Sequence, residues 1–327
     1  MRIHCSRLLL ISTLMLSGCS SVQVHLGMKV YLEKIPVTSM QASLPKGTGI
    51  GPGEKLPLVV TFTEQDGKVL TTEGAGHGKI MWNELNVTAT VATVDKKGNV
   101  SLAKDPRISD GKVPHISITA PSHPELHTDL DIPVRYDERY VANFSGSKGM
   151  DGSSGSDGMS GSSGSSGSMD PNNPSAGGNG GDGTDGSNGG DGGRGGDAPP
   201  VQVRVAFRAG SHPLLQVSVS AAGHQKFYLV DPQGGSLSVK ADGGAGGQGG
   251  RGGRGGTGGS GGMGSPSGSS GRNGLDGRSG SDGPPGKGGS ITVTYDPQAK
   301  SYLSVIYLSN SGAPKPVFQE QAVPALW

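Results

Sequence analysis

The sequence predicts an all-β protein with two β domains, the second of which carries a bundle of four glycine-rich rods. Apolar residues alternate with polar ones in many short segments, and no sustained 3.6-residue period appears. Glycine makes up 61 of the 327 residues, and 44 of these lie in four windows. Aromatic residues make up only 4%, which argues against a single large core.

Residues 1–18 have the features of an export signal. Arg2 and Arg7 precede a short apolar run that ends in Leu16-Ser17-Gly18-Cys19 and is too short to span a bilayer. This ending resembles the lipobox of bacterial lipoproteins; the alternative is an ordinary signal peptide with a chance cysteine. The resemblance implies a lipid on Cys19, anchoring in the cell envelope and, through the following Ser20, sorting to the outer membrane.

Charge and cysteine content exclude several classes of function. The formal net charge is +1, from 28 basic and 27 acidic residues, which disfavours a protein that seeks polyanions. Cys5 lies in the signal, so lipidation of Cys19 leaves no thiol for a disulfide, a metal site or a nucleophile. No later segment is apolar enough to predict a membrane-spanning helix.

The first folded domain is expected over residues 19–144 as a β-sandwich. Alternation predicts strands near 58–62, 85–93, 116–119 and 129–135, and Asp66-Gly67 and Gly98-Asn99 are suited to hairpin turns. An immunoglobulin-like architecture is expected, although the Cys–Trp–Cys hallmark is missing.

The second set of strands is split by glycine. A meander is expected over 199–242, and closing strands near 291–295 and 303–307 fall within the last segment, 290–327. The glycine-rich residues 243–289 are therefore expected to be an insertion between neighbouring strands of one sheet.

The glycine-rich segments 145–198 and 243–289 each hold two blocks with a strict period of three. The blocks are 146–167, 177–196, 243–264 and 268–289. A disordered linker has no reason to keep a phase, whereas polyproline II has three residues per turn. Short connectors with proline join the blocks in pairs, which predicts two antiparallel hairpins of rigid rods.

Blocks two and three carry a second glycine phase, which blocks one and four lack. Glycine in two of three positions leaves two faces of a polyproline II helix bare, so such a helix can accept neighbours on two sides. Blocks two and three are therefore expected to be the inner rods, and the strands near 201–310 to support the bundle at its base.

The run Gly189 to Asp197, followed by a valine-rich strand, resembles the glycine-rich N-terminal domain of Obg-type GTPases, in which polyproline II helices project from a small β barrel. The rods also resemble the snow-flea antifreeze fold. No GxxxxGK[ST] phosphate loop occurs, so GTPase activity is not implied. A collagen-like trimer is an alternative, because residues 274–289 contain collagen-like triplets, although proline is scarce; disorder is a further one.

Candidate ligand sites are few. Asp182, Asp185 and Asp191 lie at three-residue steps after a partial calcium-repeat motif, and a solvated polar ridge is the preferred interpretation. Arg251 and Arg254 form a short RGG-like run without aromatic residues, and no nucleic-acid partner is expected. His123-Pro124-Glu125-Leu126-His127 is expected to be an irregular loop rather than a metal site, so no metal or cofactor is predicted.

No nucleophile with a neighbouring base is apparent, so the chain is not expected to be an enzyme. Trp82 is expected in the core, with a binding role as the alternative, and the tail Val323–Trp327 either docks on the sheet or meets a partner. The expected function is a lipid-anchored structural spacer or adhesion module that binds the membrane through its lipid and an unknown envelope protein or polysaccharide. A monomer is favoured; the alternatives are a trimeric adhesin and an ice- or polysaccharide-binding protein.

Overall fold

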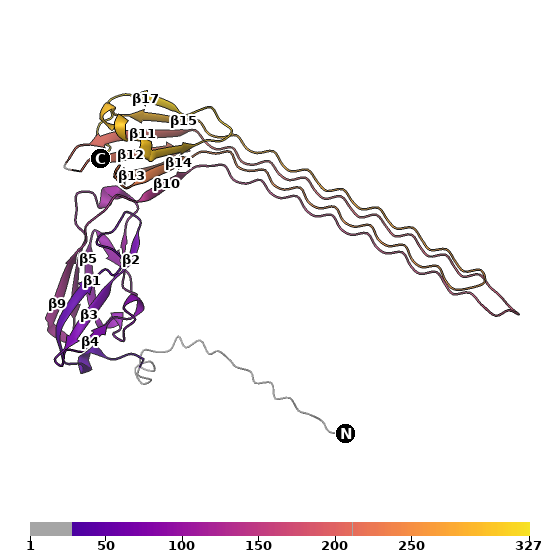
Figure 1. The fold of residues 1–327 in the computed structure, drawn as a ribbon, viewed down its shortest axis with the longest axis horizontal. Coiled ribbons are helices and arrows are strands. Elements are labelled where there is room, and N and C mark those ends of the chain that lie inside the picture. The colour runs from indigo at the N-terminus through magenta and orange to yellow at the C-terminus, as the bar shows by residue number, and fades with distance from the viewer. Residues whose placement is uncertain (1–27, 211) are drawn as a thin grey trace, which may run out of the picture. The chain divides into compact units, whose positions relative to one another are not determined.

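The computed structural model describes residues 28–210 and 212–327, and the chain divides into two compact units, Met1–Tyr136 and Asp137–Trp327. Both units are built from β-strands, and the only helices in the described ranges are short 3-10 segments, which confirms the all-β prediction (Figure 1). The 3-10 helices are η1 (Leu32–Lys34), η2 (Gly74–Gly76), η3 (Trp82–Glu84), η4 (Pro106–Ile108) and η5 (Pro297–Val305).

The boundary between the units lies between Tyr136 and Asp137, earlier in the chain than the boundary expected at residue 144. Strand β10 (Arg139–Asn143) pairs in parallel with β14 (Ser236–Lys240), so it belongs to the second unit. The alternating pattern alone gives no information on which domain a short strand joins.

Three antiparallel sheets of three strands form the first unit, and their apolar faces share one core that includes Phe62, Ile116 and Ile118. Gly67 and Gly98 adopt positive φ in the predicted turns. β1 was not predicted, because a register shift after Val37 breaks its alternation. The sheets are β1 (Val37–Ser43), β3 (Val59–Glu64) and β4 (Val69–Thr71); β2 (Lys55–Pro57), β7 (Asn99–Leu102) and β6 (Ala92–Val94); and β5 (Asn86–Thr90), β8 (His115–Ala120) and β9 (His123–Asp131).

Two sheets enclose the core of the second unit. The three-stranded sheet is parallel, in the order β10, β14 and β16 (Ile306–Ser309). The five-stranded sheet has the order β13 (His224–Val230), β12 (Leu214–Ala221), β11 (Val201–Arg208), β15 (Ile291–Tyr295) and β17 (Val317–Glu320). Valine and leucine side chains of both sheets meet in the core.

The chain crosses from the three-stranded to the five-stranded sheet three times, from β10 to β11, from β14 to β15 and from β16 to β17. The first two crossings carry the glycine blocks, and the third is the short segment 310–316. The prediction that residues 243–289 separate neighbouring strands of one sheet is therefore wrong, because β15 pairs with β11 and not with β14.

The predicted strand at 303–307 is also corrected. The helix η5 runs through Val305, and β16 begins only at Ile306. The Asp296 side chain accepts the Gln298 N–H, and Pro297 occupies the first helical position, so both residues favour a helix start here.

The glycine blocks form two long antiparallel hairpins that leave the base together (Figure 1). Hairpin 1 turns at 168–176 and hairpin 2 at 265–267. We name the blocks rod 1 (146–167), rod 2 (177–196), rod 3 (243–264) and rod 4 (268–289).

The strands set the register of the rods. Asn143 of β10 lies opposite Lys240 of β14, and the side-chain contacts between rods 1 and 3 join residues with the same separation of 97. Val201 of β11 lies opposite Ile291 of β15, and the side-chain contacts between rods 2 and 4 join residues 90 apart, which is again the strand separation. Each rod is thus a continuation of the strand to which it is joined.

Candidate functional site: the four-rod bundle

Five ladders of backbone hydrogen bonds hold the rods together. The donors are backbone N–H groups, nearly all of them from glycine. Rod 1 donates to rod 3, and rod 2 donates to rods 1 and 4. Rod 3 donates to rod 2, and rod 4 donates to rod 3, with N···O distances of 2.6–3.0 Å throughout. Rods 2 and 3 therefore each bond to three neighbours and rods 1 and 4 to two, which confirms that blocks two and three are the inner rods.

The two glycine phases of rod 2 differ in how much room they leave. A Cβ on Gly189 would overlap the carbonyl oxygen of Gly250 in rod 3. A Cβ on the adjacent Gly190 would instead lie 3.1 Å from the rotatable hydroxyl of Ser153. Thr184 and Ser187 occupy the same phase as Gly190. The close backbone approach thus requires glycine in one phase, whereas the other phase tolerates a small side chain.

A ladder of Asp and Asn side chains joins rods 2 and 4. The Oδ1 atoms of Asp182 and Asp185 accept the N–H groups of Arg272 and Leu275 at 2.6 and 2.7 Å. These aspartates are exposed, yet they act as acceptors within the bundle, so the predicted solvated ridge is only part of their role. The other members of the ladder are Asn179, Asn188, Asp191 and Asp197.

One position of this series has neither Asp nor Asn. Arg194 stands there, and the residue 90 positions later is Pro284. Proline has no backbone N–H, so no acceptor is needed at this level. The sequence of rod 2 therefore matches the donors of rod 4 position by position.

Ion pairs on the bundle are local. Lys148 Nζ lies 2.7 Å from Asp151 Oδ1, which also accepts the Gln248 N–H of rod 3. The Lys148 ammonium and that N–H lower the pKa of the Asp151 carboxyl. Arg251 and Arg254 of rod 3 are exposed, and no rod contains an aromatic residue on which a base could stack.

The tip of hairpin 1 is a compact loop that reaches beyond hairpin 2 (Figure 1). Ser168 N–H donates to the Ser175 hydroxyl at 2.7 Å, and Ser175 N–H donates to the Ser168 carbonyl at 3.0 Å. Asp170 accepts the Asn172 N–H, and the Met169 side chain between these contacts is 70% exposed. The bundle therefore ends in an ordered, solvent-facing loop.

The other predicted residues do not assemble a reactive site. His123 lies in β9 and not in an irregular loop as expected; its ring nitrogens contact Ser122 Oγ and the Ile35 carbonyl at 3.1 and 3.0 Å. His127 lies opposite Thr119 in the same strand pair. No group of three His, Cys, Asp or Glu side chains that could hold a metal occurs in 28–210 or 212–327.

Trp82 is 5% exposed and belongs to the core of the first unit, which confirms the core interpretation. Its indole N–H donates to the Glu73 carbonyl at 3.3 Å. The C-terminal tail docks on the five-stranded sheet, the first of the two outcomes considered for it: Leu326 and Trp327 bond to the Gln216 side chain.

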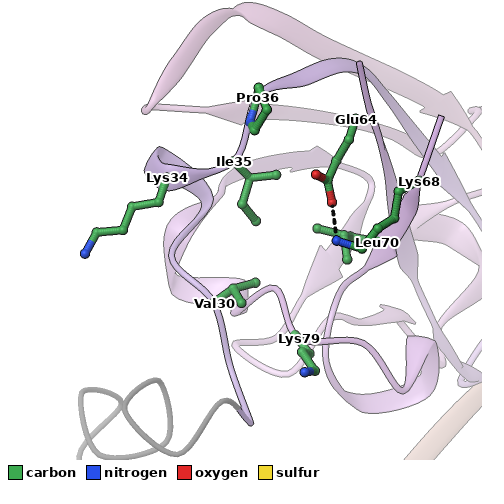
Figure 2. A pocket seen from close by; sticks show the side chains of 8 residues that line it. All are labelled: Val30, Lys34, Ile35, Pro36, Glu64, Lys68, Leu70 and Lys79. Atoms are coloured by element: carbon green, nitrogen blue, oxygen red, sulfur yellow. Dashed lines mark hydrogen bonds and ion pairs between the residues drawn. The ribbon is translucent and has the colours of Figure 1, made fainter. Parts of the chain in front are cut away.

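An open hollow of about 240 Å³ lies in the first unit (Figure 2). The Lys68 ammonium donates to Glu64 Oε1 at 2.8 Å, which raises the lysine pKa, while Lys34 points away from the hollow. The lining contains no Ser, Cys or His. Its residues are Val30, Lys34, Ile35, Pro36, Glu64, Lys68, Leu70 and Lys79.

The predicted lipidation site, Cys19, lies outside the described residues. Within the described residues, no helix has the length and apolar character needed to cross a bilayer. Comparison with protein-family models, curated proteins and solved structures found no match to this chain.

Proposed function

We propose that the chain is a non-catalytic lipoprotein of the outer membrane, anchored through Cys19, in which the rod bundle is a rigid spacer that presents the tip loop 168–176 to an envelope protein or polysaccharide. The network of backbone hydrogen bonds that links all four rods is the observation that supports this proposal. Each rod is bonded along its length to at least two others, so bending one rod requires breaking bonds in several ladders at once. With the ~3.1 Å rise of polyproline II, such a rod extends about 65 Å.

The ladders also favour a monomer over a collagen-type trimer. A collagen triple helix packs its glycines against two other chains. Here the glycine faces of all four rods lie against rods of the same chain. An added Cβ would meet a backbone atom of a neighbouring rod; in the tolerant phase of rod 2 it would meet Ser hydroxyl and backbone atoms of rod 1. No bare glycine face remains with which a second and third chain could form such a helix.

The spacer is tested by the distance from tip to base. Spin labels on Met169→Cys and Lys315→Cys, in a processed chain with Cys19→Ser, report this distance by pulsed electron paramagnetic resonance. A narrow distribution near 65 Å supports the proposal. A broad distribution centred at a much shorter distance contradicts it.

The anchor is tested separately. Full-length chain produced in a Gram-negative host should incorporate labelled fatty acid and fractionate with the outer membrane. Cys19→Ser should lose both properties, while the spin-label distance, which is measured with this substitution in place, shows that the bundle stays intact. Membrane association without fatty-acid incorporation would contradict a lipid anchor at Cys19.

A further inference from the structure

The outer face of the five-stranded sheet carries buried residues that do not belong to the core. Alternation places Ala206, Gln216 and Leu229 on the face opposite to the core-facing valines and leucines of the same strands. These three residues are cross-strand neighbours on β11, β12 and β13, and they are 1%, 4% and 0% exposed. A second part of the chain must therefore cover this row.

The C-terminal segment 321–327 provides this cover. Gln216 accepts the Leu326 N–H at Oε1, at 3.0 Å, and its Nε2 donates to the Trp327 carbonyl at 3.4 Å. The Trp327 ring meets the Phe227 ring edge to face, with centroids 5.8 Å apart. The segment thus crosses the sheet from β17 towards β13.

The start of the segment is also held. Gln321 N–H donates to the Tyr295 carbonyl at 3.0 Å, and Val323 N–H donates to the Asp296 carboxylate at 3.3 Å. Val323 is 5% exposed, although it lies outside the core of the second unit. The segment is therefore bound at both ends, by hydrogen bonds that use only its backbone.

These contacts have the chemistry of peptide recognition. An amide side chain that pairs with an N–H and a C=O of an extended backbone recognises the main chain whatever its sequence. Phe227 adds a preference for an aromatic residue at the position of Trp327, because ring pairs contribute beyond the area they bury. Removal of the segment would expose Ala206 and Leu229 beside Gln216 to water, and exposure of apolar surface is costly.

We propose that the outer face of β11–β13 is a docking site for an extended peptide that carries an aromatic residue at the position of Trp327. The chain's own segment 321–327 is its resident ligand, and the same segment of a second copy is its occupant in trans. The two occupants are chemically identical, and the resident one has the advantage of high effective concentration. Exchange between copies therefore requires that one site has lost its own segment.

The test is a complementation experiment with two full-chain variants. The first ends at Glu320 and keeps the site; the second carries Gln216→Leu and Phe227→Ala and keeps the segment. Each variant alone and the wild type should be monomeric by light scattering, whereas a mixture of the two variants should form a 1:1 complex. Absence of the complex at concentrations up to about 1 mM, or a complex formed by either variant alone, would overturn the proposal.

A peptide measurement serves as a second readout. A fluorescein-labelled peptide of residues 319–327 should bind the truncated variant with saturable anisotropy, and the Trp327→Ala peptide should bind at least 10-fold more weakly. Binding that is unchanged by Gln216→Leu together with Phe227→Ala would contradict the site.

If truncation unfolds the second unit, the variant that ends at Glu320 is refolded with and without an excess of the peptide of residues 319–327. The peptide should restore the circular dichroism spectrum of the full-length chain, because it supplies the partners that Gln216 has lost. No recovery of the spectrum at peptide concentrations up to about 1 mM would overturn the proposal.

Discussion

At the residue scale, adjacent glycines of the bundle have unequal roles. Gly189 faces a carbonyl oxygen of rod 3, which cannot move without shifting a whole rod, whereas Gly190 faces a serine hydroxyl that can rotate away. Composition treats the two residues as equivalent. The difference arises because each position of the three-residue repeat faces a different neighbour.

We expect Gly189→Ala to destabilise the bundle by more than about 3 kcal/mol, because a backbone overlap cannot be relieved locally. Gly190→Ala should cost about 1 kcal/mol or less, since alanine also reduces the entropy of the unfolded chain. Thermal unfolding followed by circular dichroism compares the two variants. Equal losses of stability would show that the rods are not packed in this register.

The Asp and Asn ladder allows a similar comparison. Asp185→Ala removes the acceptor of the Leu275 N–H and should speed hydrogen exchange at that amide, with a loss of about 0.5 kcal/mol, whereas Asp185→Asn keeps an oxygen acceptor. Arg194→Asp should bring no gain, because Pro284 offers no N–H. A gain in stability from Arg194→Asp as large as the loss from Asp185→Ala would contradict this explanation.

The stability of the bundle should also depend on the charge of Asp151. Its pKa is lowered in the folded state by Lys148 and by the Gln248 N–H. The ionised carboxylate therefore stabilises the fold above the unfolded pKa near 4, and this contribution is lost as the pH falls through the lower folded pKa. Melting curves from pH 7 to pH 2 should fall less steeply for Asp151→Asn, which keeps the acceptor without its charge.

At the scale of elements, the rods and strands form one continuous register. The separations of 97 and 90 residues hold in the sheets and in the rods alike, so pairing of β10 with β14 and of β11 with β15 aligns rods that have no apolar core of their own. The base thus compensates for the large entropy that so many glycines lose on folding.

Deletion of one three-residue repeat from each rod at the same level should keep every ladder in phase. Such a variant should fold, with its tip-to-base distance shortened by about 9 Å. Deletion of Ser154 alone places side chains of rod 1 on its glycine face and should abolish the spin-label distance peak. A folded bundle after the single deletion would show that the phase is not essential.

The periodic parts of this fold were predictable from the sequence and the long-range parts were not. A glycine every third residue specifies which face of a rod is bare, so the hairpins and the inner rods followed from local pattern. The pairing of β15 with β11 joins residues 90 apart, and nothing local encodes it. Pro124 in β9 and the register shift in β1 interrupt the alternation that identifies a strand, so β1 and the first part of β9 were not predicted.

The candidate site was predictable to the same degree. The exposed aspartates of rod 2 were noticed as a row, but their role depends on Arg272 and Leu275 in another rod. Gln216 gave no signal at all, because a glutamine within an alternating strand is typical of a solvent-facing position. Only the return of the C-terminal segment to that face explains its burial.

At the scale of the whole molecule, the boundary between the two units predicts which fragment of the chain folds alone. Residues 137–327 contain both sheets of the second unit and should fold alone with an unchanged tip-to-base distance. Residues 145–327, cut at the boundary that the sequence suggested, lack β10, the partner of β14 that also anchors rod 1. This shorter chain should lose the ordered position of rod 1, as measured by hydrogen exchange of the glycine amides from 146 to 167.

The interior of the bundle is made of peptide groups, since glycines such as Gly250 and Gly256 of rod 3 occupy its buried positions. Exposure of apolar surface raises the heat capacity on unfolding, and exposure of polar surface lowers it. Melting of the bundle should therefore show a heat-capacity change per residue well below the usual ~12–15 cal/mol/K. The unfolding enthalpy of such a bundle should stay nearly constant on cooling. The bundle should therefore not be weakened in the cold by loss of the hydrophobic driving force, as ordinary domains are.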